Sequence, residues 1–341
     1  MRFIQIVLCV ALTLPVAVWA QRPSTSGNVD SPASIPLTVV RNPRFGTYSA
    51  KIVVGIGNLS PLPFGFDTGS SGLHVFADAG LDAPNSGAQC TKIPTSVTYG
   101  NPARITYNGV VCYAQLHFAG LSTPATVPVA YLTSASCPPT NPDCRIPDVR
   151  SVKAMHGYGV FGAGLTGVMR GAGSVPNPFL TLPGRRGETF TIALRRGGGE
   201  VVLGESEPAD SAEFALRPGT RIGERYSFAQ TCLFVDGRAT GACLLISFDT
   251  GNGVPWIHDD GTIGVPQRDG FVRAGTRLGF APPQSGSPAT VVVAGTSFDD
   301  GIKVVQIPNR APLANTSIQA FFDRVVTYDD VRGVIAFADA R

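Results

Sequence analysis

The feature that most constrains this chain is a sequence that occurs twice, in which an apolar run leads into Asp-Thr-Gly. The first copy covers Gly65–Leu73 and the second covers Ser247–Gly253, so that Asp67 and Asp249 are 182 positions apart. A single Asp-Thr-Gly after a strand is a common turn, because Asp and Gly tolerate the backbone angles that turns need. Two copies, each after an apolar strand, instead indicate two similar units that each present one carboxyl group.

Composition predicts an all-β protein. Of 341 residues, 40 are glycine and 28 are proline, whereas only 15% are charged. Lysine, glutamate, glutamine and methionine are scarce, so we expect many short strands joined by turns. With 43% hydrophobic residues the chain can bury a large core, which excludes a disordered protein. The only helix that we expect is a short one at Ser317–Asp323.

The expected strands form two series on either side of a glycine-rich centre at Gly157–Gly173. The first series is Ile35–Val40, Tyr48–Ile56, Phe64–Phe66, Ser96–Tyr99, Ile105–Tyr107, Val110–Phe118 and Val127–Leu132. Directly after the centre come Thr189–Leu194 and Glu200–Leu203. The second series is Glu213–Leu216, Tyr226–Val235, Ala242–Phe248, Val254–Ile257, Gly270–Val272, Thr290–Ala294, Lys303–Ile307, Val325–Tyr328 and Val334–Phe337. Each series contains one copy of Asp-Thr-Gly.

The N-terminus has the pattern of a secretory signal peptide. Arg2 precedes the apolar run Phe3–Trp19, and the small residue Ala20 follows it. We therefore predict a signal peptide at 1–20 and a flexible segment at 21–34, and we expect export to the periplasm or the extracellular medium. No later apolar stretch reaches the roughly 20 residues that a membrane-spanning helix needs.

The charge of the chain excludes some classes of partner. There are 27 basic and 24 acidic residues, which gives a net charge of +3, and no run of like charges occurs. We therefore expect neither nucleic acid nor an acidic membrane surface as a partner. We expect the protein to be a monomer.

Cysteine number and spacing predict disulfide bonds. Without Cys9, which lies in the signal peptide, six cysteines remain, and an even number in an exported chain favours disulfides. Spacing favours local pairs: one would close a proline-rich loop, one would flank an Asp-Gly hairpin turn, and the third is left over. The favoured pairs are Cys137–Cys144, Cys232–Cys243 and Cys90–Cys112. No Cys-x-x-Cys occurs and the four histidines are scattered, so we expect no metal site.

The motifs resemble those of the pepsin-like aspartic peptidases, in a compact bacterial form, over nearly the whole mature chain. Phe66–Ser71 is similar to the first Asp-Thr-Gly element of that family, and Val97–Gly100 to its flap hairpin with a tyrosine. Further similar segments are Val160–Gly162, which matches a hydrophobic-hydrophobic-Gly element, Gly199–Gly204, which precedes the connection between lobes, and Val325–Ala338, which matches the C-terminal strand pair.

The resemblance implies a bilobal pepsin-like fold, in which two β lobes related by a pseudo-two-fold axis enclose an active-site cleft. It places the N-terminal lobe at 35–205 and the C-terminal lobe at 206–341. It also implies an aspartic endopeptidase without a cofactor, whose partner is a peptide or protein substrate. That substrate would lie across the cleft under a flap formed by Tyr99 and Gly100.

The resemblance further implies that Asp67 and Asp249 are the catalytic pair. In such a pair two carboxyl groups about 3 Å apart share one proton, because both cannot ionise together. A water molecule activated between them then attacks the peptide carbonyl. The residues expected to support the pair are Thr68, Gly69, Ser70, Thr250, Gly251, Asn252 and His74.

Three positions depart from the family pattern. Asn252 stands where the family usually has Thr or Ser, and we expect its amide to donate to the outer oxygen of Asp249. His74 stands where many members have a tryptophan that supports the flap, which leaves two alternatives: either Tyr99 contacts His74 instead, or the flap is looser. Ser317 takes the glycine position of the second hydrophobic-hydrophobic-Gly element.

Other kinds of site are less consistent with the sequence. Gly157–Gly162 satisfies Gly-x-Gly-x-x-Gly, but the residues after it are too rich in glycine for the helix that a dinucleotide site needs. The acidic pairs Asp259-Asp260 and Asp299-Asp300 each precede a glycine and are typical of solvated turns. No Gly-x-Ser-x-Gly nucleophile motif occurs.

One alternative of a different class stays open, a catalytically inactive pepsin-fold protein that binds or inhibits. Both Asp-Thr-Gly copies are intact, which favours the enzyme. A binding protein has no physical need for two facing carboxyl groups that repel each other.

Overall fold

The structure of the protein is a computed structural model that describes residues 31–42, 46–77, 81, 83–100, 104–139, 141, 144–146, 156–166, 173–220, 224–296, 300–307, 310–322 and 324–340. The predicted signal peptide, residues 21–30 of the predicted flexible segment, residues 167–172 of the glycine-rich centre, Asp299 and Asp323 lie outside the described residues. Among the described residues, no helix is both long and apolar enough to cross a membrane.

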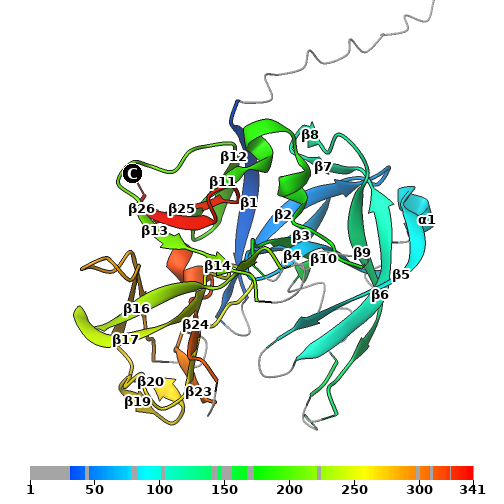
Figure 1. Cartoon of the computed structure of the whole chain (residues 1–341). Helices are drawn as coiled ribbons and strands as arrows, with labels where there is room; N and C mark the ends of the chain where they lie inside the picture. Colours follow the sequence, from blue (N-terminus) through cyan, green and yellow to red (C-terminus); the bar gives the residue numbers. More distant parts are fainter. Residues whose placement is uncertain are drawn as a thin grey trace, which may run out of the picture.

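The all-β prediction is confirmed, and the strands form two β-rich lobes (Figure 1). The larger sheet has 15 strands, and its main path runs β13-β26-β25-β11-β12-β1-β2-β3-β10-β4-β9-β6-β5. Its strands are β1 (Ala33–Arg41), β2 (Tyr48–Ile56), β3 (Leu62–Asp67), β4 (Ser71–Phe76), β5 (Gln89–Tyr99), β6 (Ile105–Ala114), β7 (Leu116–Phe118), β8 (Leu121–Ser122), β9 (Val127–Ser136), β10 (Gly159–Ala163), β11 (Thr189–Arg195), β12 (Gly198–Leu203), β13 (Ala212–Ala215), β25 (Arg324–Asp329) and β26 (Val334–Asp339).

The second sheet has nine strands in the order β19-β20-β23-β18-β24-β17-β16-β21-β22, and a separate pair joins β14 to β15. The bounds are β14 (Arg217–Pro218), β15 (Tyr226–Ser227), β16 (Ala229–Val235), β17 (Arg238–Ser247), β18 (Trp256–Asp259), β19 (Gln267–Arg268), β20 (Phe271–Val272), β21 (Arg277–Ala281), β22 (Thr290–Val293), β23 (Lys303–Gln306) and β24 (Leu313–Asn315). In Figure 1 this sheet lies on the opposite side of the molecule from β5, β6 and β9.

The C-terminal strands connect the two halves of the chain. β25 pairs antiparallel with β11, and β26 continues the sheet to β13. Strands from both ends of the sequence therefore share one sheet between the lobes (Figure 1).

Both sheets repeat one strand arrangement around an Asp-Thr-Gly loop. β10 lies between β3, to which it is parallel, and β4, to which it is antiparallel, and its register pairs Gly162 with Asp67. β24 lies between β17 and β18 in the same way. Continued by two residues, the register of β24 places Ser317 opposite Asp249. The two aspartates therefore occupy equivalent places in two similar units.

Each Asp-Thr-Gly loop begins next to a phenylalanine that is anchored in an aromatic core. Phe66 stacks on Phe161 with ring centroids 6.1 Å apart, and the rings of Phe248 and Phe337 are 4.5 Å apart. All four side chains are almost fully buried. Truncation of a buried phenylalanine to alanine costs about 3–5 kcal/mol, so these anchors hold the start of each loop in place.

Within the described ranges the remaining elements are short helical turns, and one of them corrects a prediction. They are α1 (Ala83–Ser86), η2 (Pro178–Thr181), η3 (Gly184–Gly187) and η4 (Ile318–Phe321). The helix expected at Ser317–Asp323 is the single 3-10 turn η4, because the chain returns to a strand at Arg324. Ser317 caps this turn by accepting a hydrogen bond from Gln319 N–H at 3.2 Å, and its own φ of 55° lies in the region that favours glycine.

The hairpin of β5 and β6 is longer than predicted. Instead of two strands broken at residues 108–109, β6 is continuous, with a register shift against β9 between Asn108 and Gly109. A Cβ atom at Gly109 would lie 1.8 Å from the carbonyl oxygen of Tyr131, so only glycine permits this close approach. β5 begins at Gln89 rather than at Ser96.

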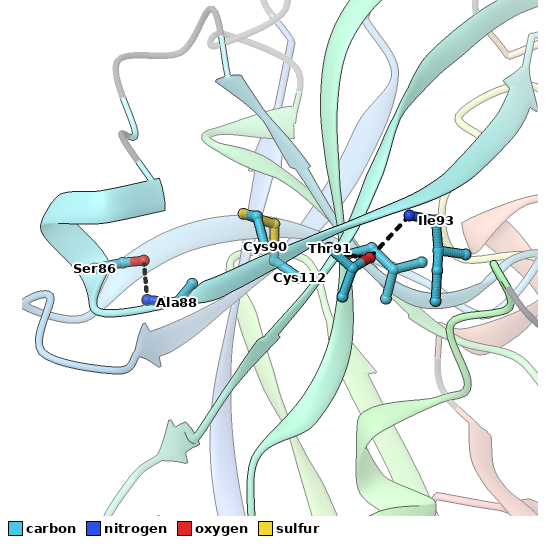
Figure 2. The surroundings of a disulfide bond; sticks show 7 residues. Ser86, Ala88, Cys90, Thr91, Ile93 and Cys112 are labelled. Carbon is cyan, nitrogen blue, oxygen red and sulfur yellow. Dashed lines mark hydrogen bonds between the residues drawn. A yellow bond between two sulfur atoms is a disulfide. The ribbon is translucent and has the colours of Figure 1, made fainter.

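Three disulfides join the pairs that spacing favours, namely Cys90–Cys112, Cys137–Cys144 and Cys232–Cys243. Figure 2 shows the first of them, which links β5 to β6. The register of these strands shifts between Cys90 and Pro94, and Thr91 spans the shift. Its hydroxyl donates to Val111 O at 2.8 Å and accepts from Ile93 N–H at 3.0 Å (Figure 2). The disulfide and Thr91 together brace the base of the hairpin that carries Tyr99.

Loss of the Cys90–Cys112 disulfide should do more damage than loss of the Cys137–Cys144 disulfide. The first closes a separation of 22 residues and the second one of 7. Chain entropy then predicts a cost of about 3 kcal/mol for the first and about 2 kcal/mol for the second. Thermal unfolding of the two double serine variants measures this difference. Equal stability of the two variants would contradict this ranking of the two disulfides.

Candidate active site

The two Asp-Thr-Gly loops are locked together by four reciprocal hydrogen bonds. Thr68 N–H donates to Thr250 Oγ1 at 3.1 Å, and Thr250 N–H donates to Thr68 Oγ1 at 3.0 Å. The Thr68 hydroxyl donates to Phe248 O at 2.8 Å, and the Thr250 hydroxyl donates to Phe66 O at 2.9 Å. Both threonines are at most 3% exposed. This buried network fixes the position of one loop against the other.

The glycine after each threonine lies directly against the carboxyl group of the opposite loop. A Cβ atom at Gly69 would lie 2.4 Å from Cγ of Asp249, and one at Gly251 would lie 2.4 Å from Cγ of Asp67. No side chain fits in that space. The absence of a side chain at both positions therefore lets the two carboxyl groups face each other.

The carboxyl oxygens of Asp67 have donors within its own loop. Gly69 N–H donates to Oδ1 at 2.7 Å, and the Ser70 hydroxyl donates to Oδ2 at 2.5 Å. Asp67 is only 8% exposed. Burial, followed by the negative charge of Asp249, raises the pKa of Asp67 well above its usual value, although the bonds from Ser70 and Gly69 oppose this shift.

The outer oxygen of Asp249 corrects the prediction for Asn252. Gly251 N–H donates to Oδ1 of Asp249 at 2.8 Å, as the equivalent glycine does in the first loop. However, Oδ2 accepts its bond from Asn315 Nδ2, at 2.6 Å. Asn252 does not take the place of Ser70: its Nδ2 donates to Oδ1 of Asn315 at 3.1 Å. Asn252 therefore acts on the carboxyl group only indirectly, through Asn315.

Asn315 is a site residue that the sequence interpretation missed. It lies at the end of β24, two residues before Ser317, in the second hydrophobic-hydrophobic-Gly segment. One signal in the sequence could have identified it. Asn315 is polar, whereas the equivalent residue of β10, Val160, is apolar. Its partner could not be read from spacing, since residues 66 positions apart meet only when β24 pairs with β17.

Tyr99 and His74 contact each other, which is the first of the two alternatives for this position. Nδ1 of His74 and the hydroxyl of Tyr99 form a hydrogen bond, and the ring centroids are 5.8 Å apart. Burial lowers the pKa of His74 to about 4, so the imidazole is neutral above that pH. Burial and then the charge of Asp67 raise the pKa of Tyr99. Gly100 follows Tyr99, and its carbonyl accepts from Arg104 N–H at 3.1 Å.

Tyr328 is a second residue that sequence reasoning missed. It lies on β25, is 1% exposed, and stacks on Phe190 with ring centroids 4.9 Å apart. Its hydroxyl donates to Phe248 O at 3.1 Å, the same carbonyl that accepts from Thr68. Burial raises the pKa of Tyr328, so the hydroxyl keeps its proton. Through Tyr328, strand β25 of the larger sheet therefore supports the second Asp-Thr-Gly loop.

The acidic pair at Asp259-Asp260 makes bonds typical of a turn, but Asp259 is only 4% exposed, so the expectation of a solvated turn is wrong for this residue. Oδ1 of Asp259 accepts from the backbone N–H groups of Gly261 and Ile263, and Oδ2 accepts from Gln306 Nε2 at 3.2 Å. Within the described ranges, no three His, Cys, Asp or Glu side chains gather as metal ligands would. The Gly-x-Gly-x-x-Gly segment continues into β10, not into the start of a helix.

Comparison with known proteins shows the fold. No family model matches the chain, and no curated protein matches it in sequence. Among solved structures it is similar to an aspartic proteinase from Irpex lacteus, with a TM-score of 0.59 and 13% identity, over 91% of this chain and 98% of that chain. The chain therefore has the pepsin-like fold of two β lobes.

Proposed function

We propose that this protein is an exported aspartic endopeptidase that hydrolyses peptide bonds with a water molecule activated between Asp67 and Asp249. The observation that carries the proposal is the pair of carboxyl groups on equivalent loops, each against the other loop's glycine. The reciprocal threonine bonds and the raised pKa of Asp67 add support. A pair that holds one proton between two carboxyls is the state that such chemistry needs.

The reaction needs only the two carboxyls and one water. In the singly protonated pair, the ionised carboxyl takes a proton from water while the water oxygen attacks the carbonyl carbon. The other carboxyl gives its proton to the carbonyl oxygen, and a gem-diol forms. The carboxyl that took the water proton then delivers it to the amide nitrogen, the other takes a proton back from a gem-diol hydroxyl, and the C–N bond breaks. The products are a carboxylic acid and an amine, and the pair is again singly protonated.

The substrate that we propose is an extended peptide lying between the lobes, under Tyr99 and Gly100. We place the boundary between the lobes near residue 205, after β12. The hydrogen bond to His74 holds the tyrosine hydroxyl, in the place where the resemblance implies a tryptophan partner. Three disulfides are consistent with an oxidising compartment outside the cytoplasm.

Hydrolysis should be fastest in acid and should fall as the pH rises. Activity requires one proton on the pair. Because the pKa of Asp67 is raised, that proton persists above the ordinary range of a carboxyl group and is lost only as the pH passes the raised value. At the acid end both carboxyls are protonated and no base is left. The profile of kcat/KM from pH 2 to 8 should therefore be bell-shaped.

Cleavage of a denatured protein between pH 3 and 6, with and without a statine-type inhibitor, tests the proposal. The inhibitor's hydroxyl takes the place of the attacking water, so it should abolish cleavage. Cleavage that the inhibitor leaves unchanged would assign the activity to another site or to a contaminant. Inhibitor binding without any cleavage would favour the inactive binding protein.

A further inference from the structure

The two facing carboxyl groups differ in the chemistry of their outer partners. Ser70, which bonds Oδ2 of Asp67, has a hydroxyl that can donate to a carboxylate or accept from a carboxylic acid. Asn315, which bonds Oδ2 of Asp249, presents an N–H group that can only donate. The pseudo-two-fold symmetry of the loops is therefore broken at the outer oxygens of the pair.

The orientation of the Asn315 amide is fixed by its other contacts. Its Oδ1 accepts from the backbone N–H of Ser317 at 2.9 Å and from Nδ2 of Asn252 at 3.1 Å. A backbone N–H cannot accept a hydrogen bond, so a flipped amide would place two donors against each other. Ser317 is fully buried and Asn315 is only 6% exposed, so water does not replace these partners. The N–H group therefore has to face Asp249.

We infer that Asn315 is a positioning residue that holds the negative charge of the pair on Asp249 and leaves the shared proton on Asp67. The inference rests on the proposed function, because it assigns roles within that reaction. Both oxygens of Asp249 accept from groups that can only donate, Gly251 N–H and Asn315 Nδ2. A proton on Oδ2 would point at another hydrogen, so the carboxylate form is favoured.

The surroundings of Asp249 agree with this assignment. Three titratable groups from different elements interact electrostatically with it, namely Asp67, Tyr99 on β5 and Tyr328 on β25. Burial keeps both tyrosines neutral, so neither adds a charge. Burial also raises the pKa of Asp67, which agrees with a proton on that side. In the reaction Asp249 would then take the proton of water, and Asp67 would protonate the carbonyl oxygen.

The kinetic test compares variants at the two outer contacts. Asn315→Leu removes the donor to Asp249, so the first ionisation becomes harder and the acid limb of the kcat/KM profile should move up by about one pH unit. The alkaline limb should stay, because it reports the later loss of the Asp67 proton. Ser70→Ala removes a bond that opposes the raised pKa of Asp67, so the alkaline limb should move up while the acid limb stays in place. Because the hydroxyl can also accept from the protonated carboxyl, this movement should be smaller than that of the acid limb in Asn315→Leu.

Asn252→Leu is the matched control for the amide network. It breaks the bond to Asn315 Oδ1 but leaves the donor to Asp249, so its acid limb should move less than that of Asn315→Leu. A purely structural role for Asn315 predicts a lower rate at every pH without movement of one limb. That outcome, or movement of both limbs together in Asn315→Leu, would overturn the inference.

A second measurement needs neither activity nor a folded Asn315 variant. In the unmodified protein labelled with ¹³C at aspartate carboxyl groups, nuclear magnetic resonance follows the two carboxyls from pH 2 to 8, with Asp67→Asn and Asp249→Asn used for assignment. Asp249 should ionise first as the pH rises. Ionisation of Asp67 first would overturn the inference. The expected order without any peptide hydrolysis would instead overturn the proposed function and leave the charge assignment standing.

Discussion

Asp67→Asn and Asp249→Asn should each lower the rate of peptide hydrolysis by roughly 10³-fold or more, since each removes one partner of the proton exchange. An amide can neither take the proton of water nor return it to the leaving nitrogen. The measurement is kcat/KM on one peptide at acid pH for the parent and both variants. Turnover near that of the parent in either variant would contradict the assignment of that aspartate.

The two variants should differ in stability. In Asp67→Asn the new amide nitrogen faces the Ser70 hydroxyl, which can accept, so the contacts with Ser70 and Gly69 both survive. In Asp249→Asn the carbonyl oxygen must face Gly251 N–H, and the new nitrogen then faces Nδ2 of Asn315, a donor, where the present contact is 2.6 Å. An unmatched pair of this kind costs about 1–3 kcal/mol, so Asp249→Asn should unfold at the lower temperature. Equal melting temperatures would show that Asn315 can turn away.

Gly69→Ala and Gly251→Ala should each abolish most activity, although both leave Asp67 and Asp249 in the sequence. The added methyl would lie 2.4 Å from Cγ of the opposite aspartate, so the two loops must move apart. A displacement of about 1 Å can cost roughly 10²-fold in rate. Measured kcat/KM should fall by at least that factor. The aromatic cores that anchor the start of each loop are not touched, so the proteins should still fold.

Gly286→Ala is the control for this pair of variants. Gly286 is exposed, and a Cβ atom there would have no neighbour within 4 Å. Its kcat/KM and stability should match those of the parent. If Gly69→Ala or Gly251→Ala behaves like Gly286→Ala, then the carboxyls do not meet across these glycines in the active protein.

Much of the fold can be predicted from sequence because local patterns determine it. Alternation of apolar residues in Tyr48–Ile56 gives a strand with those bounds. The duplicated Asp-Thr-Gly indicates two equivalent units. Prediction fails where a contact depends on a third element: β5 extends back to Gln89 because β6 pairs with it there, through the Cys90–Cys112 link.

The candidate site was predictable only within each Asp-Thr-Gly copy. Contacts across two or three residues, such as Gly69 N–H to Asp67, follow from the motif. Asn315 and Tyr328 reach the site from strands 66 and 80 positions away from their partners. Asn252 was the natural sequence candidate for the outer oxygen of Asp249, yet Asn315 fills that place and Asn252 supports it instead. Only the pairing of β24 beside β17 decides between the two amides.

Mass spectrometry of a denatured protein incubated at pH 4 with the parent and with Asp249→Asn tests the central claim most directly. The parent should produce new peptide termini at internal bonds, and the variant should produce none at equal concentration and time. Equal cleavage by both proteins would contradict a peptidase built on Asp67 and Asp249, and so would the absence of cleavage by a correctly folded parent.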